Sequence, residues 1–153
     1  MNIELTNMES QIAVAIKKEN TSMEEISVVA TEGLQKVFGF LAQAGVEIAG
    51  APYLAYSNSN EDFTSFDVEI GIPVAGEIDL IGEFIMSKTC EGKAITTMHK
   101  GAYKDVEVGY TALMGYMAEN NLESTGVYYD YYISDPADTP ESELLTQVVF
   151  PVK

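Results

Sequence analysis

Apolar residues follow two different periods along this chain, one typical of strands and one typical of helices. Residues 11–16 form an apolar, β-branched run that ends at a charged stretch, which predicts a strand. From Ile26 onward the apolar positions are three or four residues apart, which predicts an amphipathic helix ending near Gly45. Ser22 and Glu25 precede it with the spacing of a capping box. The apolar stripe of this helix comprises Ile26, Val29, Ala30, Leu34, Val37, Phe38 and Leu41.

Two further strands are predicted after the helix, at 52–57 and 65–74, with the polar turn 58–62 between them. In the second strand the side chains of one parity are apolar, whereas Asp67 and Glu69 lie on the other parity, so one face of this strand is expected to be solvated. Glu69 becomes a functional candidate only if that face lines a cleft.

The second half of the chain repeats this order of elements. Ile72-Pro73-Val74 closes the first half and is echoed by Phe150-Pro151-Val152 at the end of the second. An internal repeat of this kind determines the fold prediction. The predicted elements are a strand at 93–99, a helix at about 103–119, and strands at 126–134 and 144–152, with an additional strand at 81–86 between the halves. The apolar stripe of the second helix comprises Tyr103, Val106, Tyr110, Leu113, Met114 and Met117.

These elements predict one α+β domain over residues 1–153, built from two strand-helix-strand-strand repeats at about 10–75 and about 92–152. We expect the repeats to be related by a pseudo-twofold axis and to pair their strands into an antiparallel sheet. In this interpretation both helices cover one face of the sheet, and a ligand cleft lies on the other face.

The charge of the chain narrows the range of partners. Eight lysines, no arginine and 24 acidic residues give a net charge of −16, the wrong sign for binding nucleic acid or an anionic membrane. An acidic surface serves solubility or attracts cations, and the sequence leaves both readings open. The N-terminus lacks the features of a signal peptide, no apolar run reaches the roughly 20 residues of a membrane span, and Cys90 is the single cysteine. We therefore predict a cytoplasmic protein.

The most unusual stretch is 128–132, where four of the nine tyrosines surround Asp130. In a strand, Tyr128, Asp130 and Tyr132 share one face, and the other two tyrosines share the opposite face. A carboxylate beside aromatic rings offers charge pairing and cation–π contact to a flat, lipophilic cation. The alternative is an ordinary strand, because tyrosine has a high β propensity.

A family resemblance rests on motifs spread over residues 10–152. The segment 130–136 (Asp-Tyr-Tyr-Ile-Ser-Asp-Pro), followed by 143–147 (Glu-Leu-Leu-Thr-Gln) and 150–152 (Phe-Pro-Val), resembles the C-terminal signature of the gyrase-inhibitor-like family. This family is also known as the effector-binding domain of AraC-type and MerR-type drug-sensing regulators. The segments 99–103 and 50–53 are similar to its second-helix entry and its first-helix exit.

The resemblance implies a small-molecule cleft between the repeats, and it identifies the residues expected there. The acidic residue of the family is usually glutamate, whereas Asp130 is one methylene shorter; the tyrosine two positions later is retained as Tyr132. About ten residues precede the first predicted strand, so we expect a stand-alone member without a DNA-binding segment. The predicted ligand-binding residues are Asp130, Tyr132, Tyr128, Tyr53 and Tyr56.

Two functions follow from this interpretation. The favoured one is a binding module that senses or sequesters a lipophilic or cationic aromatic molecule and affects transcription only through a separate regulator protein. The alternative, implied by stand-alone relatives, is a hydrolase of electrophilic cyclopropane-containing compounds, with Asp130 activating water and Tyr132 donating a proton. His99 lacks partners for a metal and Cys90 lacks an adjacent base, so no metal or cofactor is predicted. The ligand's identity and the oligomeric state are left open.

Overall fold

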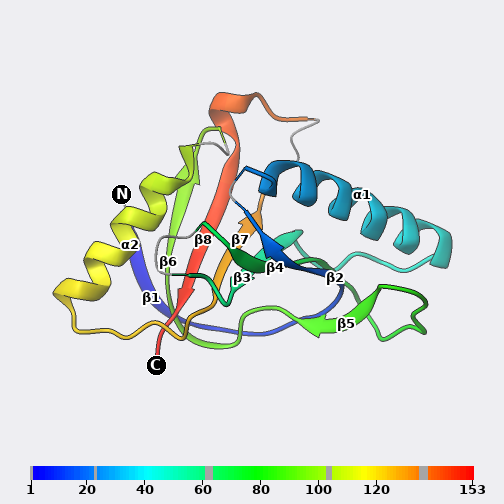
Figure 1. Cartoon of the computed structure of the whole chain (residues 1–153), viewed down its shortest axis with the longest axis horizontal. Coiled ribbons are helices and arrows are strands. Elements are labelled where there is room, and N and C mark those ends of the chain that lie inside the picture. Colours follow the sequence, from blue (N-terminus) through cyan, green and yellow to red (C-terminus); the bar gives the residue numbers. More distant parts are fainter. Residues whose placement is uncertain (1, 23, 61–63, 103–104, 135–137) are drawn as a thin grey trace.

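All the described strands join one antiparallel sheet, with two helices packed on it (Figure 1). The computed structural model describes residues 2–22, 24–60, 64–102, 105–134 and 138–153. The strands are β1 (Ile3–Met8), β2 (Ile12–Thr21), β3 (Tyr53–Ser57), β4 (Phe66–Pro73), β5 (Ile85–Lys88), β6 (Gly92–Lys100), β7 (Tyr128–Tyr132) and β8 (Leu145–Pro151). The helices are α1 (Ile26–Ala44) and α2 (Glu107–Glu119), and a 3-10 turn, η2 (Glu141–Glu143), precedes β8.

The sheet has eight strands in the order β1-β6-β8-β7-β3-β4-β2-β5. Strands β7 and β3 pair at its centre, with β3-β4-β2 from the first half of the chain on one side and β7-β8-β6 from the second half on the other. The N-terminal strand β1 is added at the β6 edge, and β5 is added at the β2 edge. The prediction of an α+β fold with two helices and an antiparallel sheet is confirmed. The pseudo-twofold relation between the halves remains a prediction.

The first helix follows its sequence pattern closely. Val37 and Leu41 are buried, and α1 ends at Gly45, whose φ of 68° is the left-handed conformation that glycine adopts without strain. Phe38 was expected in the apolar stripe, but 42% of its surface is exposed. The expected capping box is half formed before the helix. The Glu25 N–H donates to Ser22 Oγ at 3.3 Å, but the Glu25 carboxylate accepts from the Ser22 hydroxyl.

The second helix differs more from its predicted form. It begins at Glu107, after a turn at 105–106, whereas the sequence predicted a start near Tyr103, which lies outside the described residues. Leu113 is buried as expected, but Met114 is 48% exposed. The weak apolar stripe of this helix explains why its boundary was harder to predict than that of α1.

One strand was not predicted from the sequence, and another was predicted at the wrong residues. Strand β1 pairs with β6 at one edge of the sheet, although its residues were expected to precede the first strand. The strand expected at 81–86 instead begins at Ile85 and forms the other edge, paired with β2. The apolar patterns of edge strands are short and half-exposed, because an edge strand pairs with only one neighbouring strand and packs on only one face.

Both helices pack against the same face of the sheet, which we call the helix face. Cross-strand partners in a sheet point to the same side. The partner pairs Ile16–Ile70, Ile70–Leu54, Leu54–Asp130, Asp130–Val148 and Val148–Thr97 therefore place one row of side chains on one face. A Cβ added to Gly33 of α1 would touch Ile70, and one added to Gly109 of α2 would touch Val148. The row thus passes under both helices.

The apolar core follows from this arrangement. One cluster lies under α1 and includes Leu54, and another lies under α2 and includes Val148. A third cluster surrounds Tyr53 on the opposite face. Within the described part of the chain, neither helix is long and apolar enough to cross a membrane.

Candidate functional site

Asp130 lies at the centre of the helix face, on the middle residue of β7. Its cross-strand neighbours are Leu54 of β3 and Val148 of β8, so it separates the core cluster under α1 from the cluster under α2. Only 3% of its surface is exposed. A carboxylate this deeply buried among apolar residues is costly unless it is hydrogen-bonded or paired. A carboxylate retained at this position therefore indicates a functional site.

Two tyrosine hydroxyls hold this carboxylate in place. Tyr110 of α2 donates to Asp130 Oδ2 at 2.5 Å, and Tyr56 of β3 donates to the same oxygen at 3.2 Å. The other oxygen, Oδ1, is buried and has no hydrogen-bond partner among the described residues. One carboxylate oxygen is thus fully used by the fold, and the other is left for something else.

Burial changes the acid–base chemistry of this group. Desolvation raises the pKa of Asp130 to about 6, although the hydrogen bonds from Tyr110 and Tyr56 and the charge of His99 oppose the rise. Desolvation and the neighbouring Asp130 charge also raise the pKa values of Tyr56 and Tyr110 well above that of a free tyrosine. Both tyrosines therefore remain protonated donors, while Asp130 titrates near pH 6.

The structure brings together four of the five predicted ligand-binding residues. Tyr56 donates to Asp130, and Tyr132 lies two residues along β7 on the same face, packed against the cluster under α1. Tyr128 is also on this face, but it packs against Phe150, and its hydroxyl accepts from Ser124 at 3.2 Å. The aromatic surroundings expected for Asp130 are therefore largely present.

Tyr53 lies on the opposite face of the sheet, away from Asp130. It is fully buried, pairs across strands with Tyr131, and donates to Glu69 Oε2 at 2.7 Å. Ser87 donates to the same oxygen at 2.8 Å, and Tyr129 and Tyr131 stack nearby with their rings 10° from parallel. Glu69 is thus half-buried and hydrogen-bonded, on a face separate from that of Asp130.

The sequence interpretation placed the ligand cleft on the face opposite the helices, with Asp130 as a ligand-binding residue, and left open which face of strand 126–134 lines the cleft. Asp130 points toward the helices, so it does not line a cleft on the opposite face. The strand alternation was correct, but a sequence pattern alone does not say which parity faces which layer.

Sequence reasoning did not assign Tyr110 or Thr146 to this site, and it interpreted His99 only as a residue without partners for a metal. Tyr110 was expected only as part of an apolar stripe, because a helical period does not reveal where a hydroxyl points. Thr146 of β8 pairs with Tyr132 and His99, which places all three on the helix face. His99 is buried, and because a carbonyl only accepts, its Nε2 carries the proton that it donates to Ala102 O at 2.9 Å.

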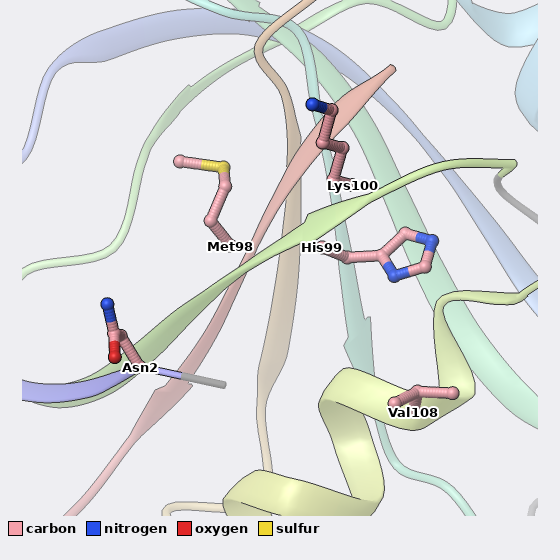
Figure 2. Close-up of a pocket in the computed structure, with 5 residues that line it drawn as sticks. All are labelled: Asn2, Met98, His99, Lys100 and Val108. Atoms are coloured by element: carbon pink, nitrogen blue, oxygen red, sulfur yellow. The ribbon is translucent and has the colours of Figure 1, made fainter. Parts of the chain in front are cut away.

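An open surface depression of about 480 Å³ adjoins this region through His99. It is lined by Asn2, Met98, His99, Lys100 and Val108. In Figure 2 the side chains of His99 and Met98 leave β6 in opposite directions, with Val108 of α2 on the His99 side. Asp130 is not among its lining residues, so the depression is a neighbour of the buried site and not the site itself. Over the described ranges, no three His, Cys, Asp or Glu side chains are grouped as metal ligands would be.

The thiol of Cys90 is buried on the far side of the sheet from Asp130. Burial raises its pKa to about 11, and its backbone N–H donates to the Tyr131 hydroxyl at 3.0 Å. A thiol with a raised pKa is a poor nucleophile.

We expect Tyr110→Phe to raise the pKa of Asp130 further, because the hydrogen bond from Tyr110 is the strongest of the effects that lower it. NMR titration of the Asp130 carboxyl carbon measures this directly. Tyr56→Phe is the matched control and should cause a smaller rise, since its hydrogen bond is longer, 3.2 Å against 2.5 Å. Equal pKa values in Tyr110→Phe and the wild type would contradict the assignment of Tyr110 as the main donor.

Comparisons with solved structures support the fold described above. The C-terminal domain of EcmrR has a TM-score of 0.83 at 19% identity, covering 99% of this chain and 97% of that one. The chain spans 57% of the EcmrR chain in a cryo-EM structure of the EcmrR–DNA complex, with a TM-score of 0.84 at 20% identity.

Two further structures share the fold. SAV2435 bound to tetraphenylphosphonium has a TM-score of 0.69 at 15% identity, covering 100% of this chain and 94% of that one. A hydrolase from Listeria innocua has a TM-score of 0.67 at 11% identity, covering 99% and 91%.

At the level of sequence, none of the curated proteins matches the chain. The model of the GyrI-like small molecule binding domain, however, matches residues 1–153. This match spans both halves of the sheet and includes Asp130 and its tyrosines. The chain belongs to the GyrI-like family of small-molecule binding domains.

Proposed function

We propose that this domain binds a lipophilic organic cation at Asp130, on the helix face of the sheet, and acts as a sensor or a sequestering protein. The observation that carries the proposal is the buried Asp130 carboxylate, with one oxygen held by Tyr110 and Tyr56 and the other without a partner among the described residues. A buried charge of this kind is stabilised when an opposite charge reaches it.

The surroundings of Asp130 suit an aromatic cation better than a small inorganic one. Tyr56 and Tyr132 offer ring faces or edges beside the carboxylate, and a cation over a tyrosine ring gains further attraction where water is excluded. The net charge of −16 also attracts a cation toward the domain before it binds.

In this proposal the two halves of the chain are pseudo-twofold repeats that meet at the site. The strand order supports this, because β6-β8-β7 and β2-β4-β3 have the same sequence of elements and their inner strands, β7 and β3, pair with each other. Asp130 and Leu54 are directly opposite at this central pair. The ligand would enter on the helix face, where α1 contacts β2 and β4 and α2 contacts β6 and β8.

The relatives support both parts of the proposal. SAV2435 has been solved bound to tetraphenylphosphonium, a lipophilic cation, on the same fold. EcmrR has been solved in a complex with DNA and carries this domain in a longer chain. A role of the present domain in transcription would depend on a DNA-binding segment or a separate regulator, because its own net charge opposes contact with DNA.

Hydrolysis of an electrophilic small molecule is the second candidate function. Asp130 with a pKa near 6 and the protonated Tyr110 form a base and an acid within hydrogen-bonding distance, which is the pairing that general acid–base catalysis uses. The hydrolase from Listeria innocua shares the fold, at 11% identity.

A ligand screen distinguishes the two functions. Thermal shift with wild-type protein should show stabilisation by lipophilic cations such as tetraphenylphosphonium and little effect of neutral aromatic molecules of similar size, because a ligand that binds the folded state stabilises it by mass action. Electrophilic cyclopropanes are incubated in parallel and analysed for product by mass spectrometry. Consumption of these compounds without any stabilisation by cations would favour the hydrolase.

A further inference from the structure

A second buried oxygen, on a diagonal neighbour of Asp130, also has no hydrogen-bond partner among the described residues. The hydroxyl of Thr146 is on a residue that is 1% exposed, and Oγ1 forms no hydrogen bond with any described part of the chain. Buried hydroxyls are nearly always hydrogen-bonded, because the loss of water otherwise costs free energy. Asp130 Oδ1 and Thr146 Oγ1 are the two side-chain atoms of this kind in the described residues.

The register of the sheet places these two residues close together on one face. Asp130 is opposite Val148, and Tyr132 is opposite Thr146, so Asp130 and Thr146 are diagonal neighbours on adjacent strands. Both are on the helix face. Diagonal neighbours have Cβ atoms about 7 Å apart, and a donor nitrogen hydrogen-bonds an oxygen at about 2.9 Å. One nitrogen group between the two side chains is therefore able to reach both oxygens.

We propose that the ligand's charged group is a protonated amine or amidine whose N–H groups bridge Asp130 Oδ1 and Thr146 Oγ1; this rests on the proposed function and specifies its ligand class. A carboxylate accepts hydrogen bonds only, and a hydroxyl oxygen accepts as well as donates. A charge alone satisfies Asp130 but leaves the Thr146 hydroxyl unpaired. A quaternary ammonium or phosphonium ion has no N–H, so it is expected to bind less tightly than a matched ion that has one.

Such a pair of buried oxygens discriminates strongly between ligands that have an N–H group and ligands that lack one. A site whose buried polar groups require a donor rejects an analogue without it far more strongly than an apolar pocket rejects a change in size. Other groups on this face already have partners. Tyr110 and Tyr56 donate to Asp130 Oδ2, and His99 donates to a backbone carbonyl. Among the described residues, Asp130 Oδ1 and Thr146 Oγ1 are the buried side-chain atoms left to select the ligand.

The test uses a naphthylmethylamine and its trimethylammonium derivative, measured by calorimetry or fluorescence quenching with the full chain. We expect wild-type protein to prefer the amine by tenfold or more, on the order of one hydrogen bond to a charged donor. Thr146→Val keeps the shape of the side chain and removes the hydroxyl. It should weaken amine binding by about tenfold and leave binding of the trimethylammonium ion unchanged.

Thr97→Val is the matched control. Thr97 is also buried on the helix face, but its hydroxyl already donates to Asn2 O at 2.8 Å. The preference for the amine should survive in this variant. The melting temperature of both variants checks folding. Thr146→Val should match or exceed the wild type, because it removes a hydroxyl that has no partner, whereas Thr97→Val should melt lower.

The possible results distinguish a failure of this inference from a failure of the proposed function on which it rests. If both cations bind wild type equally, or if Thr146→Val keeps the amine preference, the bridging role of Thr146 is wrong and the cation site at Asp130 stands. If neither these cations nor tetraphenylphosphonium binds, or if binding persists unchanged in Asp130→Asn, the proposed function fails together with the inference.

Discussion

Asp130→Asn is expected to weaken the binding of lipophilic cations by about a hundredfold or more. The substitution keeps the shape of the side chain, and its amide oxygen still accepts from Tyr110 and Tyr56. It removes the negative charge in a site that is 3% exposed, where solvent screens little. Loss of one partner from a buried, hydrogen-bonded charge pair costs about 2–5 kcal/mol, which corresponds to this change in affinity. Calorimetric titration at pH 8, where Asp130 of the wild type is ionised, measures it.

Glu69→Gln is the control for this experiment. Glu69 is the half-buried carboxylate on the opposite face of the same sheet, and it accepts hydrogen bonds from Tyr53 and Ser87. The substitution changes the net charge by the same amount as Asp130→Asn. Cation affinity should remain at the wild-type level, so a general effect of charge is separated from a local one. A loss of binding in Glu69→Gln with none in Asp130→Asn would place the ligand on the other face.

Strand β7 shows how much of the candidate site could be predicted from the sequence. The alternation of 128–132 correctly predicted that Tyr128, Asp130 and Tyr132 share a face, because the side-chain period of a strand is fixed. It did not say that this face lies under the helices, which depends on long-range packing. Tyr53 was grouped with Asp130 from its residue type, but its cross-strand partner is Tyr131, so it points the other way.

Residues that reach Asp130 from distant elements could not be predicted from the sequence. Tyr110 approaches Asp130 from a helix 20 residues earlier, and the helical period gave it only an apolar role. Thr146 lies within the motif at 143–147, but that motif did not mark it as a site residue. It became a candidate only when the register put it beside Asp130 and showed that its hydroxyl has no partner in the described residues. The helices and central strands, in contrast, were predicted to within a few residues in most cases, since their periods are local.

The stability of the ligand-free domain should fall as the pH rises from about 4 to about 6. The pKa of Asp130 is raised by burial from 3.8 to about 6 in the folded state. The folded protein therefore holds this proton more tightly than the unfolded chain does. Its contribution to stability is complete below about pH 4 and is lost as the pH passes through the folded-state pKa. A shift of this size corresponds to about 3 kcal/mol of unfolding free energy.

Comparison with Asp130→Asn isolates this effect from the other titrating groups. The charged and titratable groups that act on Asp130 are Tyr56 of β3, Tyr110 of α2 and His99 of β6, and all of them are retained in the variant. The difference in unfolding free energy between the variant and the wild type, from urea titrations at each pH, should grow by about 3 kcal/mol in total as the pH rises from below about 4 to about 7, and then level off. A difference that is constant with pH would mean that folding does not shift the pKa of Asp130.

Cation binding should show the opposite dependence on pH. A cation requires the ionised carboxylate, so its affinity should fall by about tenfold for each pH unit below the pKa of Asp130 and reach a plateau above it. The ligand-free domain is thus least stable at the pH values at which the site binds a cation most tightly. This is the relation expected if the carboxylate is kept buried for its ligand and not for the fold, because Asn at this position would satisfy the same two tyrosines at less cost to stability. A permanently charged probe such as tetraphenylphosphonium makes the measurement clean, since only the protein titrates over this range.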